Sequence, residues 1–398
     1  MRISRAVGVL ICGAWVLNLT AVYAGELSGY VAVEGRYFFQ DPLYAGQEEH
    51  NGSISAQPEY YHKWDNGSSF TFVPFVRLDS ADSERTHFDI REMYYLFPGD
   101  SWTFRIGVTR VFWGTTEFEH LVDIINQTDF IENIDGEDKL GQPMVNLTFP
   151  RKWGTLDFYI LPYFRERTFP GTKGRLRPAL PIDTGRTIYE SRDREHSFDM
   201  AVRYSHTIGD CDFGIYYFRG TNRQTWLLPG TNDIGEPILI PAYDKIDQFG
   251  FDLGWAVGNW MWKLEAINRE GYGYRFFAAT GGFEYTFYSV SDSRTDIGIV
   301  GEYAYNERRD EAVSPFDNDI MLGLRWTPND AADTQCLIGF MKDVVDPTSL
   351  FTIEASRRFG KNWRLNLELW SFFNVAEDSY LYSIRDDDFL RLELAYYF

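Results

Sequence analysis

The end of the chain is the feature that most constrains its fold. Residues 386–398 read DDDFLRLELAYYF, and apolar side chains recur at every second position there: Leu390, Leu392, Leu394, Tyr396 and Phe398. Successive side chains of a β-strand point to opposite faces, so this period of two predicts a strand with one apolar and one charged face. Chain ends are usually solvated and loose, so such an apolar end indicates a strand held within a sheet.

This ending resembles the C-terminal strand of Gram-negative outer-membrane β-barrels. In that family, the barrel-assembly machinery recognises a terminal Phe that has an aromatic residue two positions before it. The resemblance implies that Tyr396 and Phe398 form an assembly signal and that this machinery is a partner of the chain.

The other end has the pattern of an export signal. Arg2 and Arg5 precede an apolar stretch at 6–17, and small residues lead to a cleavage site after Ala24. The apolar stretch is too short for a transmembrane helix, which needs about 20 residues. The pattern predicts a signal peptide over 1–24 and a mature chain of 25–398 that passes through the periplasm.

Composition favours a membrane barrel over a helical membrane protein. The chain has 25 Tyr, 32 Phe and 12 Trp, yet 24% of its residues are charged. Lipid-facing and lumen-facing residues alternate in a barrel, so their hydropathies cancel along the sequence. The net charge of −20 argues against nucleic-acid binding, which needs a basic surface. After cleavage only Cys211 and Cys336 remain, and we place them too far apart around the wall to form a disulfide.

Segments in which apolar and polar residues alternate divide the mature chain into eighteen predicted strands. Several strand boundaries are weakly marked, so a count of sixteen strands is the alternative. The strands are predicted to start near residues 27, 52, 69, 87, 101, 143, 154, 197, 212, 247, 260, 275, 295, 317, 334, 350, 363 and 388. Short turn sequences between them alternate with long loops, as in barrels with tight periplasmic turns and long outer loops. We therefore predict an all-β fold in which 25–398 form a single transmembrane antiparallel barrel, with both ends in the periplasm.

The third long loop, 113–142, is the most informative interior segment. It is strongly acidic, and Thr116 and Glu119 have the spacing of a capping box, which predicts a short helix. In general porins, the loop after the fifth strand folds into the barrel and narrows the pore. The resemblance implies that 113–142 does the same; an acidic surface loop is the alternative.

Strand periodicity places Arg77, Arg91 and Arg105 on the inner face of strands three to five. An acidic loop that faces these arginines would create a transverse field across the pore. The hypothesised constriction therefore comprises Glu117, Glu119, Asp123, Asp129, Glu132, Arg77, Arg91 and Arg105. The alternative is structural, because inward acids such as Glu34 and Glu368 could pair with the inward arginines.

The remaining charged and titratable residues indicate no chemistry. The basic loop 166–196 either binds lipopolysaccharide phosphates and steers anions or is simply solvated. The six His are scattered, without the spacing of a catalytic group or a metal site, so we expect no enzyme activity, no metal and no cofactor.

Several short strings resemble a less characterised family of proteobacterial porin-like barrels: Trp113-Gly114, 123–126, Asp129 and 142–144. We predict a porin of the bacterial outer membrane, a channel for passive diffusion of small hydrophilic solutes or ions. Its expected partners are outer-membrane lipids, lipopolysaccharide and the solutes, and it could form a homo-oligomer. The alternatives are an export-associated or structural barrel and, third, an outer-membrane hydrolase.

Overall fold

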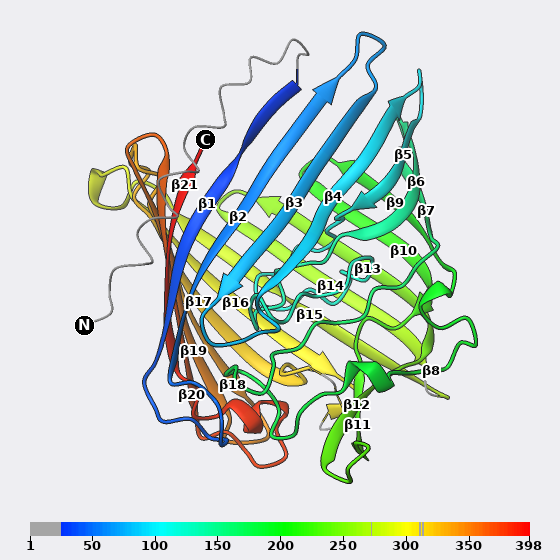
Figure 1. Cartoon of the computed structure of the whole chain (residues 1–398). Helices are drawn as coiled ribbons and strands as arrows, with labels where there is room; N and C mark the ends of the chain where they lie inside the picture. Colours follow the sequence, from blue (N-terminus) through cyan, green and yellow to red (C-terminus); the bar gives the residue numbers. More distant parts are fainter. Residues whose placement is uncertain (1–24, 272, 310–311, 313) are drawn as a thin grey trace, which may run out of the picture.

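The strands of the chain close into a barrel. The computed structural model describes residues 25–271, 273–309, 312 and 314–398, and the predicted signal peptide lies outside them. Eighteen strands form one antiparallel sheet in which the last strand, β21, pairs with the first, β1 (Figure 1). Closure removes free sheet edges, so the wall pairs its own backbone groups, as the bilayer core requires.

The wall strands tilt and run in chain order around the barrel. Their bounds are β1 (Gly25–Phe38), β2 (His50–Lys63), β3 (Ser69–Asp79), β4 (His87–Pro98), β5 (Thr103–Thr109), β6 (Gln142–Arg151), β7 (Gly154–Leu161), β9 (Asp199–Ile208), β10 (Cys211–Thr221), β13 (Lys245–Val257), β14 (Trp260–Gly271), β15 (Tyr274–Phe287), β16 (Asp296–Asn306), β17 (Asn318–Thr327), β18 (Gln335–Asp343), β19 (Ser349–Phe359), β20 (Trp363–Phe373) and β21 (Phe389–Tyr397).

Each of the eighteen predicted strands is present and begins within two residues of its predicted start. Three further strands were not predicted and lie within long loops. They are β8 (Ile188–Tyr189), β11 (Trp226–Thr231) and β12 (Pro237–Tyr243), which form a small separate sheet. Short 3-10 turns occupy Thr184–Arg186, Arg194–His196, Val290–Asp292 and Tyr380–Ile384. Within the described residues, no helix has the length and apolarity needed to cross a membrane.

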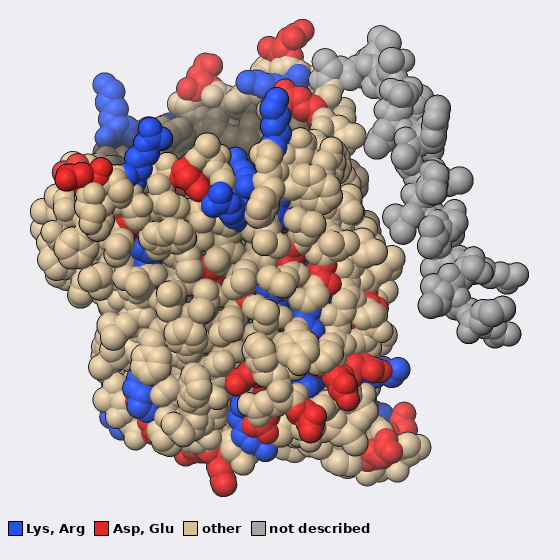
Figure 2. Space-filling model, turned by 90° about the vertical axis from the view of Figure 1, so that its left-hand side faces the viewer, with Lys and Arg blue, Asp and Glu red and all other residues tan. Residues whose placement is uncertain are grey.

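Alternation along the strands separates a lipid-facing surface from a lumen. On β17, Ile320 and Leu322 are 47% and 54% exposed, whereas Met321 between them is fully buried. Likewise Phe249 of β13 is exposed on the outside, and its neighbour Gln248 is buried inside. The outer surface is therefore apolar, and in Figure 2 charged side chains gather mainly toward the two ends of the wall. Such a belt fits a bilayer and not water.

Aromatic side chains ring the wall near its short turns. Trp260 stacks on Trp262 with ring centroids 5.5 Å apart, and Trp363 packs edge-on against Tyr396 at 5.0 Å. Aromatic rings of this kind concentrate where a membrane meets water. This girdle and the apolar belt place the barrel in the bacterial outer membrane.

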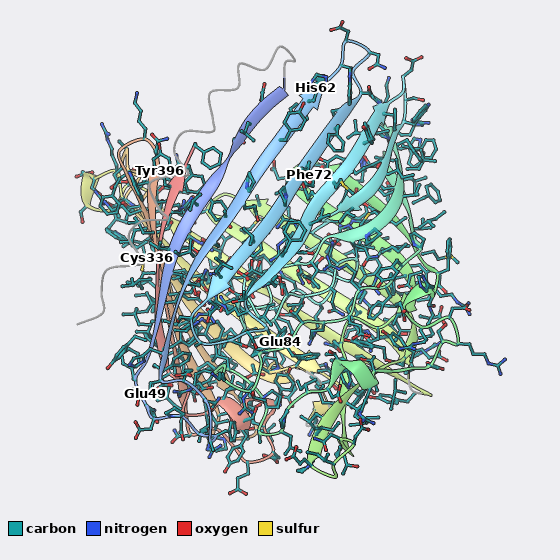
Figure 3. The ribbon with its side chains drawn as sticks, in the orientation of Figure 1. Glu49, His62, Phe72, Glu84, Cys336 and Tyr396 are labelled. Atoms are coloured by element: carbon teal, nitrogen blue, oxygen red, sulfur yellow. The ribbon has the colours of Figure 1, made fainter. Side chains whose placement is uncertain are left out.

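Short turns and the chain end lie at one end of the barrel, and the long loops lie at the other. Figure 3 shows His62 near the turn end and Glu49 and Glu84 near the loop end. The two described cysteines are free, as predicted; Cys211 starts β10 and Cys336 lies on β18, six strands further around the wall.

This topology predicts which residues label from outside the cell. In a Cys211→Ser, Cys336→Ser background, Ile234→Cys on the β11–β12 loop should react with an impermeant maleimide in intact cells, because Ile234 is 80% exposed at the loop end. Lys361→Cys, in the turn between β19 and β20, is the matched control and should label only after the outer membrane is permeabilised. The reverse pattern would overturn the orientation.

The C-terminal aromatic residues carry a second prediction. The backbone N–H of Phe398 donates to the Gly29 carbonyl at 3.0 Å, close to the seam between β1 and β21. Deleting Phe398 removes this bond and the expected recognition signal. The fraction of heat-modifiable, membrane-inserted barrel should fall, and the periplasmic fraction should rise. Normal insertion of the deletion variant would contradict the assembly role of Tyr396 and Phe398.

Candidate functional site

The segment between β5 and β6 folds into the lumen, as predicted, so the alternative of an acidic surface loop is wrong. We call residues 113–142 the lumen loop (Figure 1). Val122, Ile125 and Asp129 in this loop are each fully buried, although they lie far from any strand of the wall in sequence. The loop therefore lies inside the barrel.

Wall carboxylates hold the first half of the lumen loop through its backbone. Glu265 of β14 accepts from the N–H groups of Thr115 at 2.7 Å and Val122 at 3.1 Å. Glu302 of β16 accepts from the N–H groups of Glu117 at 2.8 Å and Phe118 at 3.2 Å. Hydrogen bonds to a charged partner are the stronger class, so these two residues fix where the loop crosses the lumen.

These bonds also explain why the predicted helix is absent. Residues 113–125 contain no helix. The Thr116 hydroxyl contacts the Glu119 carbonyl oxygen at 2.6 Å and the Glu265 carboxylate at 2.7 Å, instead of capping a helix. Because wall carboxylates take up the N–H groups that a helix would need, the capping-box prediction fails here.

The side chain of Phe118 fits against a pair of wall glycines. Gly323 of β17 and Gly339 of β18 are directly opposite each other in the sheet. A Cβ atom at either position would lie 3.2–3.3 Å from the Phe118 ring, closer than nearly all such contacts. The glycines therefore leave the recess in which this part of the lumen loop packs.

Wall arginines hold the second half of the lumen loop on the opposite side. Arg77 of β3 pairs with Glu132 at 2.6 Å, and Arg91 of β4 pairs with Asp129 at 2.6 Å. Arg85, from the loop before β4, donates to the Ile131 carbonyl at 2.8 Å. The structure thus brings together four of the eight predicted constriction residues, as two buried ion pairs.

A wall carboxylate lies at the centre of the arginine cluster. Glu34 of β1 pairs with Arg85 at 2.8 Å, Arg391 at 2.9 Å and Arg77 at 3.2 Å. Arg391 also reaches Glu368 at 2.8 Å. The structural alternative therefore applies to this cluster, since inward arginines and inward acids compensate each other.

The other predicted constriction residues do not face strands three to five. Glu117 pairs with Arg325 at 2.7 Å and Lys263 at 3.0 Å, both on the opposite wall. Glu119 accepts a hydrogen bond from Ser314 at 2.9 Å, and Asp123 pairs with Lys139 at 3.1 Å. The guanidinium of Arg105 lies 5.0 Å from the centre of the Tyr94 ring. The expected contact of Glu117, Glu119 and Asp123 with the arginines of β3–β5 is therefore wrong, because this part of the loop crosses the lumen to the opposite wall.

The loop 166–196 also turns inward in part. Arg167, Arg175 and Arg177 are only 5–8% exposed, and Arg175 pairs with Asp387 at 2.6 Å. Neither the lipopolysaccharide role nor the solvated role fits these three side chains, because all three are buried inside the barrel mouth. Arg192 is exposed.

Two cavities lie on either side of the lumen loop. The outer cavity measures about 710 Å³ and lies among the long loops and the loop-side halves of β18–β20. The inner cavity measures about 300 Å³ and is lined by the turn-side halves of β17–β21. Both cavities are lined by Glu117, Asp135, Leu337 and Glu354. Sequence reasoning missed Asp135 and Glu354 as site residues, because only the folded loop shows which acids reach the junction.

The junction carries carboxylates that the described residues leave without a salt bridge. Glu117 is compensated by Arg325, and Arg391 of the inner cavity is engaged by Glu368. Within the described chain, no salt bridge forms at Asp135 or Glu354. Burial raises the pKa of Asp135, and the neighbouring carboxylate of Glu368 raises it further. Carboxylates without a salt bridge in the described chain therefore lie where the two cavities meet.

Two groups of side chains have metal-ligand geometry. In the first, His87 lies beside Asp129 and Glu132, but Arg91 and Arg77 already neutralise these carboxylates. The second comprises Asp317, Asp319 and Asp343. The backbone N–H of Asp317 donates to Asp319, and that of Val345 donates to Asp343 in an ordinary Asx turn. Neither group has a feature that points to a bound ion.

The closed eighteen-strand barrel and its apolar belt define an outer-membrane β-barrel, and the chain is a member of this class. No family model matches the chain, and no curated protein matches its sequence. Solved structures do match. Wzi of Escherichia coli, described as a carbohydrate-binding β-barrel involved in group 1 capsule assembly, is 11% identical with a TM-score of 0.51, over 92% of this chain and 83% of Wzi.

Two further similar structures have lower TM-scores. OmpT, an outer membrane protein of Vibrio cholerae in its trimer form, is 11% identical with a TM-score of 0.49, over 94% of this chain and 99% of that chain. A porin variant of Rh. blastica is 11% identical with a TM-score of 0.46, over 94% of this chain and 100% of that chain.

The attachment of the lumen loop gives a third prediction. Replacing Glu265 and Glu302 by Ala should loosen the first half of the loop, because each lost charge-assisted bond is worth about 1.5–3 kcal/mol. Trypsin should then cleave after Lys139 faster than in the unaltered barrel, whereas Glu49→Ala, in an exposed loop, should change nothing. Unchanged cleavage in the double variant, with heat-modifiability intact, would show that these carboxylates do not hold the loop.

Proposed function

We propose that the protein is a channel for passive diffusion of small hydrophilic solutes through the outer membrane, with the lumen loop as its constriction. The observation that carries the proposal is the pair of cavities, one on each side of the loop, that share lining residues at Glu117, Asp135, Leu337 and Glu354. An eighteen-strand barrel is wide enough to enclose an aqueous lumen, and here a loop divides it. Passage needs no cofactor and no energy.

The charges at the junction favour cations on this path. Rings of carboxylates select cations in channels, because their negative charge attracts cations and repels anions. Asp135 and Glu354 can act in this way, since their charge is not consumed by a salt bridge within the described chain. The raised pKa of Asp135 means that its charge, and with it part of the cation preference, should be lost as the pH falls.

The alternative functions have less support from the geometry. A hydrolase needs a cluster of catalytic groups, whereas His120 is bound to Glu137 at 2.9 Å and His87 lies beside carboxylates that arginines hold. A structural or export-associated barrel would need a partner protein. A periplasmic component that co-purifies with the barrel in stable stoichiometry would favour that role.

The proposal gives a fourth prediction, on ion selectivity. Asp135→Asn combined with Glu354→Gln should shift the reversal potential in an asymmetric KCl gradient toward anion selectivity, because it removes the uncompensated charge at the junction. Arg77→Gln with Arg91→Gln should move the lumen loop more than it shifts the ion selectivity of the channel, since both side chains are held in ion pairs with the loop. The shift should shrink as salt rises, because the Debye length falls from about 10 Å at 0.1 M to about 3 Å at 1 M.

Glu49→Gln is the control for this measurement, because Glu49 is an exposed acid of an outer loop. A purified, heat-modifiable barrel that gives no conductance in planar bilayers would overturn the channel. Conductance with an unchanged reversal potential in the Asp135→Asn, Glu354→Gln variant would place the constriction elsewhere.

A further inference from the structure

The outer cavity is lined mainly by apolar side chains, which is unusual for the mouth of a channel that passes ions alone. Its wall includes Phe130, Phe316, Met341, Trp370 and Leu381. At about 710 Å³, it lies within the roughly 300–1,000 Å³ of typical small-molecule sites, which are apolar with a few placed polar groups. The wall therefore fits a solute with an apolar body.

One of the polar groups on this wall is a buried arginine whose N–H groups are not all hydrogen-bonded within the described chain. Arg177 is 5% exposed, and its Nη1 donates to the carbonyl oxygens of Pro178 at 2.8 Å and Ala179 at 3.2 Å. Its Nε is buried and finds no hydrogen-bond acceptor among the described residues, which also supply no carboxylate in salt-bridge contact with it. Leaving a buried charge without a counter-charge is costly, so Arg177 is suited to an anionic group of a ligand.

A second arginine of the cavity wall has the same character. Arg167 is 8% exposed and donates through Nη2 to the Arg223 carbonyl at 3.0 Å. Its guanidinium lies 4.7 Å from the centre of the Phe130 ring. Its hydrogen bonds and its ring contact within the described chain are all to neutral groups. Two cations without a carboxylate partner thus line one apolar cavity.

Charges of the opposite sign lie at the floor of the cavity. Asp135 and Glu354 line the junction with the inner cavity, and neither forms a salt bridge within the described chain. A solute that bears only an anionic group would be attracted by Arg177 and repelled by this floor. A solute with an ammonium group at its other end would be attracted by both.

From this polarity we infer that the outer cavity is a binding site for zwitterions with an apolar body, of which short peptides with apolar side chains are the simplest example. The carboxylate of the solute binds Arg177, with Arg167 beside it, the apolar body packs among the aromatic and aliphatic side chains, and the ammonium group faces Asp135 and Glu354. This inference rests on the proposed channel, and it names the class of solute that the channel concentrates at its constriction.

The experiment measures binding to the purified full barrel in detergent by isothermal titration calorimetry, so it does not depend on conduction. The probe is the dipeptide Phe-Leu. N-acetyl-Phe-Leu lacks the ammonium group, Phe-Leu amide lacks the carboxylate, and Gly-Gly lacks the apolar body. We expect Phe-Leu to bind at least about tenfold more tightly than each of the three, because each lacks one charge-assisted contact or the apolar burial.

Matched variants assign the two ends of the solute to their partners. Arg177→Gln should weaken Phe-Leu about tenfold or more while leaving Phe-Leu amide unchanged, since the amide has no carboxylate to lose. Glu354→Gln should weaken Phe-Leu and leave N-acetyl-Phe-Leu unchanged. Arg192→Gln, an exposed arginine of the same loop as Arg177, should change nothing. Arg177→Lys keeps the charge and should recover part of the affinity, and heat-modifiability shows that each variant is folded.

Equal affinity for Phe-Leu and N-acetyl-Phe-Leu would overturn the inference and indicate a site for an apolar anion. Equal affinity for Phe-Leu and Gly-Gly would show that the apolar wall does not contribute to binding. Absence of Phe-Leu binding in a barrel that conducts ions refutes the solute class and leaves the channel standing. Absence of conductance with intact Phe-Leu binding refutes the channel and leaves a binding barrel.

Discussion

The structure depends on the clamp that holds the lumen loop between two walls of opposite charge. On one side, Glu265 and Glu302 accept hydrogen bonds from the backbone of the loop. On the other side, Arg77 and Arg91 pair with the loop carboxylates Glu132 and Asp129. The loop is therefore fixed at both of its halves, and this is what divides the lumen into an outer and an inner cavity.

Such a clamp is stable only when it is complete. Removing one partner of a buried ion pair leaves an uncompensated charge and costs about 3–5 kcal/mol, much more than an exposed pair contributes. Glu34 illustrates the consequence, because it pairs with four arginines and keeps their guanidinium groups in one small volume: Arg36, Arg77, Arg85 and Arg391. The wall and the loop therefore form one network, in which the position of the loop is tied to the register of β1, β3 and β21.

Alternation in the sequence predicted the wall because a strand has a fixed period of two, and a slip of one residue would turn every side chain to the wrong face. This is why Ile320 and Leu322 face outward, whereas Met321 between them faces inward. The same reasoning failed inside the lumen. The capping box at Thr116 is a pattern of neighbouring residues. In the structure, the Thr116 hydroxyl instead contacts Glu265, which lies 149 positions further along the chain. A contact at that separation follows from how the closed barrel brings β14 beside the loop, which no local pattern records.

The charged side chains that form no ion pair in the clamp are the ones that can bind a solute. Glu132, Asp129, Glu117 and their cationic partners neutralise one another, so they hold structure and contribute little field to the cavities. Arg177 stands outside this pairing on the outer side of the lumen loop, and Asp135 and Glu354 stand outside it at the junction. Folding alone gives no reason to keep a buried arginine and two lumen carboxylates without counter-charges within the described chain, since apolar residues of similar volume would be no worse. Their placement on the wall of one apolar cavity is explained when a dipolar solute supplies the missing partners for both.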